Sequence, residues 1–228
     1  MGAGGEEEPF ESIYARAGSD LDSIPWADLA PNPALVSWLA SQAVGEGVSG
    51  LGPGVSGLGP GVQALGPGMP ALVVACGLGD DAEALASRGY AVTAFDVSQT
   101  AIEQCHARFP ASTVDYLVAD VFGLPEAWTQ AYALVVEIRT LQSLPPENRA
   151  SAATAIAGTV APGGWLFVRT AVREPDEPLT SRPWPLVRGE LDAFLEAGLT
   201  EREAREDPPG ASRFRMFTAV YQRGGSTT

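Results

Sequence analysis

From residue 71 onward, short apolar runs alternate with stretches of helical periodicity, and this alternation restricts the fold more than any other feature of the chain. Five runs predict strands, at residues 71–76, 91–96, 114–119, 132–137 and 165–170. Four stretches predict helices, at residues 80–88, 98–108, 146–159 and 188–197. Strands joined by helices form right-handed crossovers and a largely parallel sheet. The sequence therefore predicts an α/β protein, a three-layer αβα sandwich.

Two further strands are predicted at residues 200–205 and 213–223, on either side of a Pro-Pro-Gly turn. Residues 71–75 and 133–136 are apolar throughout, which is typical of strands buried on both faces. We therefore expect a Rossmann-like sheet of seven strands, mostly parallel with one antiparallel strand. Ligands of such sheets bind outside the carboxyl ends of the strands.

The chain divides into four parts by composition. Residues 1–43 predict a helical segment that acts as a lid, and residues 44–70 contain a seven-residue repeat rich in Gly and Pro. Such a composition buries little side-chain surface, so we expect a flexible surface insertion. Residues 71–223 form the main domain, and residues 224–228 form a tail.

The charge balance excludes several classes of partner. The 28 Asp and Glu against 14 Lys and Arg give a formal net charge of −14, which repels a phosphate backbone, so we expect no nucleic acid partner. Cys76 and Cys105 form neither a disulfide framework nor a metal-ligand pattern. The sequence shows no secretory signal and no apolar span of about 18 residues. We expect a cytoplasmic location, no membrane and no metal. The sequence leaves the oligomeric state open, with a monomer as one alternative.

Gly77 and Gly79 lie where the first strand must turn into a helix, and they allow a ligand to approach the backbone closely. Gly77-x-Gly79-x-x-Ala82 also fits the loose form of the dinucleotide fingerprint, which is a weak signal by itself. Asp80 and Asp81 follow at the first helical positions. Two carboxylates favour a cationic ligand there and disfavour a diphosphate.

Aspartates follow the next two predicted strands. Asp96 comes 17 positions after Gly79, close to the spacing at which an acid accepts both hydroxyls of a ribose; alternatively, it caps the following helix. Asp120 could accept the adenine amino group between Val121 and Phe122, or it could be a loop aspartate. Together, three successive strand ends predict a nucleoside-binding edge.

Residues 73–80, 95–98, 119–120 and 161–168 resemble the successive motifs of class I S-adenosylmethionine-dependent methyltransferases. The resemblance covers roughly residues 71–223 and is greatest to the thiopurine-methyltransferase-like small-molecule branch. It implies S-adenosyl-L-methionine as the cofactor and a sulfur or oxygen nucleophile of a small molecule as the methyl acceptor. The cofactor-side positions that it implies are Cys76, Gly77, Gly79, Asp96, Val97, Asp120, Val121 and Glu137.

The sequence departs from the family pattern at two positions. Ala75 replaces the first motif glycine, and Val73 replaces an upstream acid, so we expect Glu137 or a backbone carbonyl to hold the methionine ammonium. Trp26 is a candidate to cover the cofactor, with a core tryptophan as the alternative. Candidate acceptor-binding residues are Tyr14, Arg139 and Trp184.

Methyl transfer needs alignment and exclusion of water rather than a protein nucleophile, so no catalytic residue is assigned. His106 is expected at the surface, away from the strand ends. Two alternatives remain open from the sequence. One is an NAD(P)-dependent Rossmann oxidoreductase, and the other is a non-catalytic protein that binds S-adenosylmethionine as a sensor or scaffold.

Overall fold

A computed structural model describes residues 9–44, 65–179, 182–208, 210 and 212–225 of the chain. Most of the predicted Gly/Pro repeat therefore lies outside the described residues. Within them, eight strands form one sheet: β1 (Pro70–Val74), β2 (Ala91–Asp96), β3 (Asp115–Val118), β4 (Tyr132–Ile138), β5 (Val160–Arg173), β6 (Leu186–Val187), β7 (Leu199–Glu206) and β8 (Arg215–Arg223). The principal order is β3-β2-β1-β4-β5-β8-β7, and the two-residue β6 pairs with β5.

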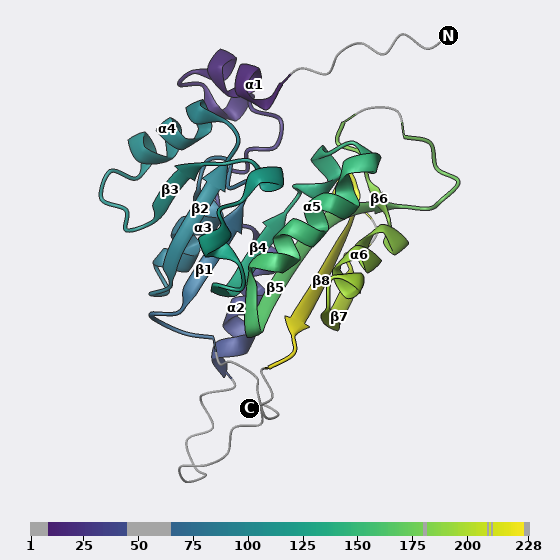
Figure 1. Cartoon of the computed structure of the whole chain (residues 1–228). Helices are drawn as coiled ribbons and strands as arrows, with labels where there is room; N and C mark the ends of the chain where they lie inside the picture. Colours follow the sequence, from purple (N-terminus) through teal and green to yellow (C-terminus); the bar gives the residue numbers. More distant parts are fainter. Residues whose placement is uncertain (1–8, 45–64, 180–181, 209, 211, 226–228) are drawn as a thin grey trace.

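The helices are α1 (Phe10–Ala17), α2 (Pro33–Val44), α3 (Asp80–Ala86), α4 (Gln99–Arg108), α5 (Pro146–Thr159) and α6 (Asp192–Glu196). In Figure 1, α5 and α6 lie in front of the sheet and α2 lies behind it. Strand β8 runs antiparallel to both of its neighbours, β5 and β7, whereas the pairs among β1 to β5 are parallel. The predicted three-layer sandwich with one antiparallel strand is confirmed, and β6 is an addition to the seven strands expected.

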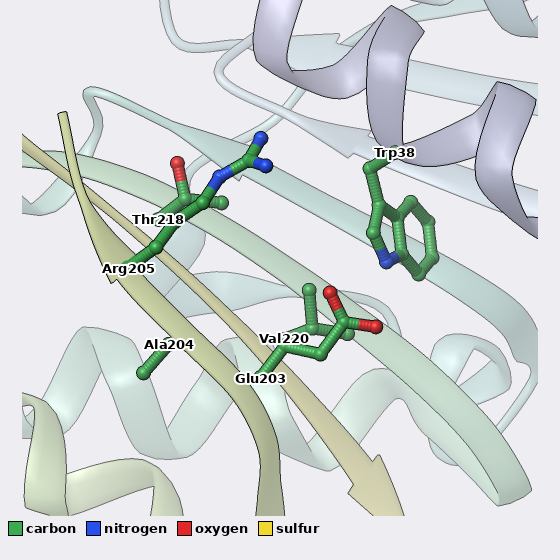
Figure 2. A pocket seen from close by; sticks show the side chains of 6 residues that line it. All are labelled: Trp38, Glu203, Ala204, Arg205, Thr218 and Val220. Atoms are coloured by element: carbon green, nitrogen blue, oxygen red, sulfur yellow. The ribbon is translucent and has the colours of Figure 1, made fainter.

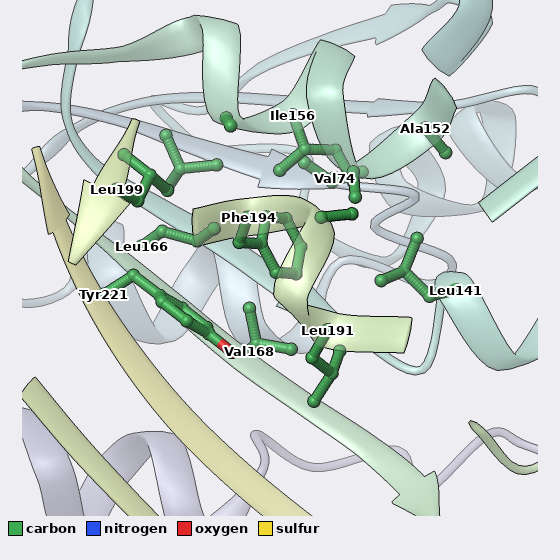
Figure 3. Packing of buried hydrophobic residues seen from close by; sticks show 14 of the residues in the cluster. Val74, Leu141, Ala152, Ile156, Leu166, Val168, Leu191, Phe194, Leu199 and Tyr221 are labelled. Carbon is green, nitrogen blue, oxygen red and sulfur yellow. The ribbon is translucent and has the colours of Figure 1, made fainter. Parts of the chain in front are cut away.

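Buried side chains form one core on each face of the sheet. On the α5 face, Ile156 and Phe194 of the helices pack with Val74, Leu166 and other strand residues (Figure 3). Successive strand residues point to opposite faces, so Val73 belongs to the core on the other face. Apolar side chains on both faces explain why the central strands are continuous apolar runs.

The core on the opposite face includes helix α2. Leu35 and Trp38 of this helix are buried against the sheet together with Phe167. Helix α1 packs instead against α4, at the edge of the molecule (Figure 1). Among the described residues, none of the helices combines the length and apolar character required to cross a membrane.

Several element boundaries differ from those predicted. Strand β1 ends at Val74 because Ala75 has a φ of +47° and turns the chain. Strand β5 begins five residues before the prediction, since the sequence Pro162-Gly163-Gly164 indicated a turn. The predicted helix at residues 188–197 is divided into a 3₁₀ turn (Arg188–Leu191) and α6.

Candidate cofactor and acceptor site

The turn between β1 and α3 carries the backbone conformations that the glycines were expected to provide. Gly77 and Gly79 have φ values of +54° and +88°, in the region that L side chains rarely adopt. A Cβ on Gly77 would lie 3.0 Å from the Tyr14 hydroxyl oxygen, and one on Gly79 would lie 2.6 Å from that of Tyr116. Both positions therefore require glycine.

Asp96, at the end of β2, is bound to this turn. Its Oδ2 accepts a hydrogen bond of 2.9 Å from the Gly77 amide, and its Oδ1 accepts one of 3.0 Å from the Ser98 amide. The side chain is buried, and burial raises the pKa of its carboxyl group despite these hydrogen bonds. The turn and the end of β2 thus form one rigid unit.

The N-terminal segment covers the turn through three aromatic residues. Tyr14 is buried, and its hydroxyl oxygen accepts a hydrogen bond of 2.9 Å from Trp26 Nε1. The Trp26 ring also contacts Phe10 edge-on, with centroids 5.6 Å apart. The guanidinium of Arg182, from the connection after β5, lies 4.3 Å from the centroid of the Phe10 ring. The aromatic cluster therefore extends from the Gly77 turn to the β5 connection.

Glu11 fastens α1 to the start of α4. Its carboxylate accepts hydrogen bonds from the Ser98 hydroxyl at 2.6 Å, from the Thr100 amide at 3.2 Å and from the Thr100 hydroxyl. The hydrogen bond from Ser98, followed by that from the Thr100 hydroxyl, lowers the pKa of Glu11. The helix that carries Tyr14 is thereby held beside Asp96.

The two aspartates that open α3 have protein partners. Arg108 binds Asp80 through both ends of its guanidinium, at 2.8 Å each. Asp81 accepts a hydrogen bond of 2.7 Å from the Asn32 amide, and burial raises the pKa of Asp81 to about 6. Our expectation that both carboxylates would favour a cationic ligand is therefore incorrect for Asp80, whose charge Arg108 neutralises.

Exposed apolar side chains gather at the carboxyl ends of β2 and β3. Val97 is 55% exposed and Phe122 is 48% exposed, which is unusual for side chains of this kind. Asp120 follows β3 and is exposed. Its side chain accepts a hydrogen bond of 3.0 Å from the Phe122 amide. Val121 is directed into the core on the α5 face, so Phe122 presents the accessible apolar surface at this position.

Glu137, at the end of β4, is completely buried. Its Oε1 accepts hydrogen bonds from the amides of Thr140 at 2.6 Å and Leu141 at 3.1 Å. Its Oε2 has no hydrogen-bond partner among the described residues. Burial raises the pKa of Glu137 to about 7. The side chain thus holds the turn after β4 and keeps one buried carboxyl oxygen without a hydrogen-bond partner.

The predicted acceptor-side residues occupy two places. Arg139 follows β4, forms an ion pair of 3.0 Å with Asp28 and donates a hydrogen bond of 3.3 Å to the Trp26 carbonyl. Tyr14 and Arg139 therefore both contact Trp26. Trp184 lies on the connection after β5, where its amide donates a hydrogen bond of 2.7 Å to the Gln142 carbonyl.

Both cysteines lie at the turn. The Cys105 thiol donates a hydrogen bond of 3.2 Å to the Gly77 carbonyl, and a hydrogen bond with Cys105, followed by burial, raises the pKa of the Cys76 thiol. His106 is exposed on α4, as expected.

Contacts that the sequence did not indicate involve Glu11, Asn32, Gln142 and Arg149. For Glu11, the available sequence signal is the i, i+3, i+4 spacing of Phe10, Ile13 and Tyr14, which is typical of an amphipathic helix.

A separate shallow hollow lies beside α2, on the surface of β7 and β8 (Figure 2). Trp38 forms one wall, and Glu203, Arg205 and Thr218 face it from the strands. None of the predicted site residues lines this hollow.

The sequence is similar to those of known methyltransferases. Residues 71–164 match the family described as a methyltransferase domain. The ubiquinone biosynthesis O-methyltransferase of Bordetella avium is 27% identical over 172 residues, which cover 69% of this chain and 70% of that protein.

Two solved structures share the fold. The 1,6-didemethyltoxoflavin-N1-methyltransferase of Burkholderia thailandensis, with bound 1,6-didemethyltoxoflavin and S-adenosylhomocysteine, has a TM-score of 0.67 at 14% identity, covering 94% of this chain and 87% of that chain. The second structure comes from work on the conversion of a disulfide bond into a thioacetal group during echinomycin biosynthesis. It has a TM-score of 0.64 at 21% identity, covering 90% of this chain and 86% of that chain. These proteins do not test the resemblance to the thiopurine-methyltransferase-like branch, which stays a prediction. Residues 71–164 of this chain match a methyltransferase domain, and the sheet has the Rossmann-like α/β fold of S-adenosylmethionine-dependent methyltransferases.

Proposed function

We propose that this chain transfers a methyl group from S-adenosyl-L-methionine to an oxygen or sulfur nucleophile of a small molecule. The observation that carries the proposal is the hydrogen bond between the Gly77 amide and Asp96 at the carboxyl edge of the sheet. Exposed Val97 and Phe122 belong to the same edge. A close-approach turn, a diol acceptor and an apolar surface for a purine ring are the three features that bind an adenosyl group.

The residues at this edge fit the ribose, the adenine and the methionine ammonium of the cofactor. Asp96 would accept the ribose hydroxyls, and Asp120 would accept the adenine amino group with Val97 and Phe122 against the ring. The free Oε2 of Glu137 is a buried acceptor for a cationic group, which supports its proposed role toward the methionine ammonium.

When bound, S-adenosylmethionine supplies an activated methyl group, so the chain's own residues have to bind, align and exclude water. Two observations support such a role for Tyr14 and Trp26: the Tyr14 hydroxyl lies against the Gly77 turn, and it accepts a hydrogen bond from Trp26. Arg139 fastens the same segment to the end of β4 through the Trp26 carbonyl. On the acceptor side, the proposal assigns Tyr14, Arg139 and Trp184.

The relatives favour oxygen within this proposal. The protein of Bordetella avium is named as an O-methyltransferase that acts in ubiquinone biosynthesis. We therefore place phenols ahead of thiols as acceptors for this chain.

The sheet order argues against a nicotinamide-dependent oxidoreductase. Dinucleotide-binding folds have the strand order 3-2-1-4-5-6 with parallel strands. Here the antiparallel β8 is inserted between β5 and β7. The bidentate pair of Arg108 with Asp80 also occupies the start of α3, where a pyrophosphate would bind.

Calorimetry with S-adenosylhomocysteine tests the cofactor, with Asp96→Ala as the variant and Asp115→Ala, an exposed aspartate at the start of β3, as the control. We expect binding by the parent and the control, and its loss in Asp96→Ala. Absence of binding by the parent, or tight binding of a nicotinamide dinucleotide instead, contradicts the proposal.

A panel of phenols and thiols, followed by product mass, then tests transfer. Addition of one methyl group to a phenol is the expected result. Binding of S-adenosylhomocysteine without turnover on any acceptor would favour the non-catalytic sensor or scaffold.

A further inference from the structure

Arg149, on the first turn of α5, is a fully buried cation that the cofactor site does not use. Its side chain is 2% exposed. Nε donates to the Leu144 carbonyl at 3.1 Å, Nη1 to Glu190 Oε1 at 2.7 Å and Nη2 to the Trp184 carbonyl at 2.7 Å. Burial of a charge is costly unless it is paired and hydrogen-bonded, so this guanidinium has a defined structural task.

The three acceptors of Arg149 belong to three different segments. Leu144 follows the turn after β4, Trp184 lies on the connection after β5, and Glu190 lies in the 3₁₀ turn before α6. Glu190 is itself held, because its Oε2 accepts a hydrogen bond of 2.6 Å from the Val187 amide. The planar fork of an arginine can bond all three at once, which a lysine cannot do.

The backbone of Trp184 is fixed from both sides. Its carbonyl is bound by Arg149, and its amide donates to the carbonyl of Gln142. Gln142 is buried, and its side-chain Oε1 accepts a hydrogen bond of 2.5 Å from the Ala171 amide of β5. Trp184 also lies between Pro183 and Pro185, which restrict the backbone further.

The indole of Trp184, in contrast, is partly exposed and makes no ring or cation–π contact with the described residues. Two positions before it, Arg182 stacks on Phe10, whose ring contacts Trp26 above the cofactor turn. A fixed backbone thus carries a flat apolar side chain two residues from Arg182, the residue that contacts the aromatic cluster. Such an arrangement suits stacking of a planar ring.

We propose that Arg149 is a positioning residue for the methyl acceptor: it fixes Trp184 so that the indole forms a preformed wall for a planar aromatic acceptor. The inference rests on the proposed function for the identity of the bound molecule. It goes beyond that function in naming a residue, Arg149, that acts on the acceptor through another residue, Trp184.

Arg149→Lys keeps the charge and removes the fork. We expect it to raise the KM for a phenolic acceptor roughly tenfold, since about one well-oriented contact is lost, with kcat and S-adenosylhomocysteine affinity within about twofold of the parent. Trp184→Ala is expected to raise the same KM. In the double variant, Arg149→Lys should add little, because its effect passes through the indole. Fully additive effects would contradict the proposal.

Arg88→Lys is the matched control, since the side chain of Arg88, just after α3, bonds a single carbonyl among the described residues, that of Ala84. It should leave the KM unchanged. If Arg149→Lys does not fold, Glu190→Gln provides a milder variant, because the Glu190 side chain is 27% exposed and the guanidinium stays in place.

A second readout needs neither cofactor nor turnover. In protein labelled with 5-fluorotryptophan, the Trp184 fluorine signal is assigned by its loss in Trp184→Phe. We expect one sharp signal in the parent and in Arg88→Lys, and a broadened or shifted signal in Arg149→Lys. An unchanged signal overturns the positioning role. If the parent binds no S-adenosylhomocysteine, the proposed function fails, and the fluorine spectrum still decides the role of Arg149.

Discussion

The amide of Gly77 donates a hydrogen bond of 2.9 Å to the carboxylate of Asp96, and this contact joins the turn after β1 to the end of β2. Residues 19 positions apart are thereby fixed in one geometry. A carboxylate held by two backbone amides is preorganised to accept further hydroxyl donors. The contact therefore sets the orientation in which a ribose can bind.

We expect Asp96→Asn to weaken S-adenosylhomocysteine binding roughly 10- to 100-fold, because hydrogen bonds to a charged acceptor contribute about 1.5–3 kcal/mol. The amide group keeps the size of the side chain but places an NH₂ group opposite a backbone donor. Isothermal calorimetry measures the change, with Asp115→Asn as the control. Equal affinities of Asp96→Asn and the parent would exclude Asp96 from the ribose site.

Gly77→Ala is expected to destabilise the fold by about 1–2 kcal/mol from the positive φ, with an added cost from the contact with Tyr14. In the background of Tyr14→Phe, which removes the contacting hydroxyl, the cost of Gly77→Ala should be smaller. Urea unfolding of the four proteins measures this coupling. Gly123→Ala is the control, since a Cβ there meets nothing within 4 Å and its φ is not positive. Equal costs in the two backgrounds would contradict the placement of Tyr14 over the turn.

The positions of Asp96 and Asp120 could be predicted because strand ends of a parallel sheet share one edge, and a strand end can be recognised from local apolar patterns. The partner of Asp80 could not be predicted in this way. Arg108 lies 28 residues away, and the contact depends on how α4 packs beside α3. The charge of Asp80 in the sequence therefore said little about the charge at the folded site.

The burial of Arg149 shows the same limit more clearly. In the sequence, Arg149 follows Glu147 in a polar stretch that opens a helix, where a solvated side chain is the usual outcome. Its three acceptors come from segments that meet only after the sheet has formed. Local periodicity predicts helices and strands, but it holds no information about such long-range polar contacts.

We expect Glu137 to make the free energy of unfolding decrease as the pH rises. Glu137→Gln should make this decrease smaller. The folded-state pKa of Glu137 is about 7, above the ordinary value of 4.5. Between these values the folded state binds more protons than the unfolded state, so the free energy of unfolding decreases with increasing pH, and the loss is complete above pH 7. The upper limit for this group is roughly 3 kcal/mol.

Denaturant unfolding between pH 5 and pH 8 measures that effect. Glu137→Gln can still accept the two amide hydrogen bonds through its carbonyl oxygen, so the fold should be retained. Relative to the parent, the variant should gain stability at pH 8 and not at pH 5. Asp81 and Asp96, whose pKa values are also raised by burial, are present in both proteins and cancel in the comparison. Parallel pH profiles of the parent and the variant would contradict the assignment.

Glu11→Gln is expected to loosen α1 without unfolding the domain. The Glu11 carboxylate accepts all of its hydrogen bonds from the first turn of α4, and an uncharged amide would keep only some of them. The amides of α1 should then exchange with deuterium faster, whereas those of β1 and β4 should not change. Glu103→Gln is the control, because in the described part of the chain Glu103 on α4 bonds only Gln99 of its own helix. In the parent, the protection factors of the α1 amides, which are corrected for the intrinsic pH dependence of exchange, should fall on acidification. The reason is that the pKa of Glu11 is lowered in the folded state, so its stabilising contribution is lost as the pH falls through that value. Unchanged exchange in α1 of Glu11→Gln would mean that the aromatic cluster alone holds this helix over the cofactor turn.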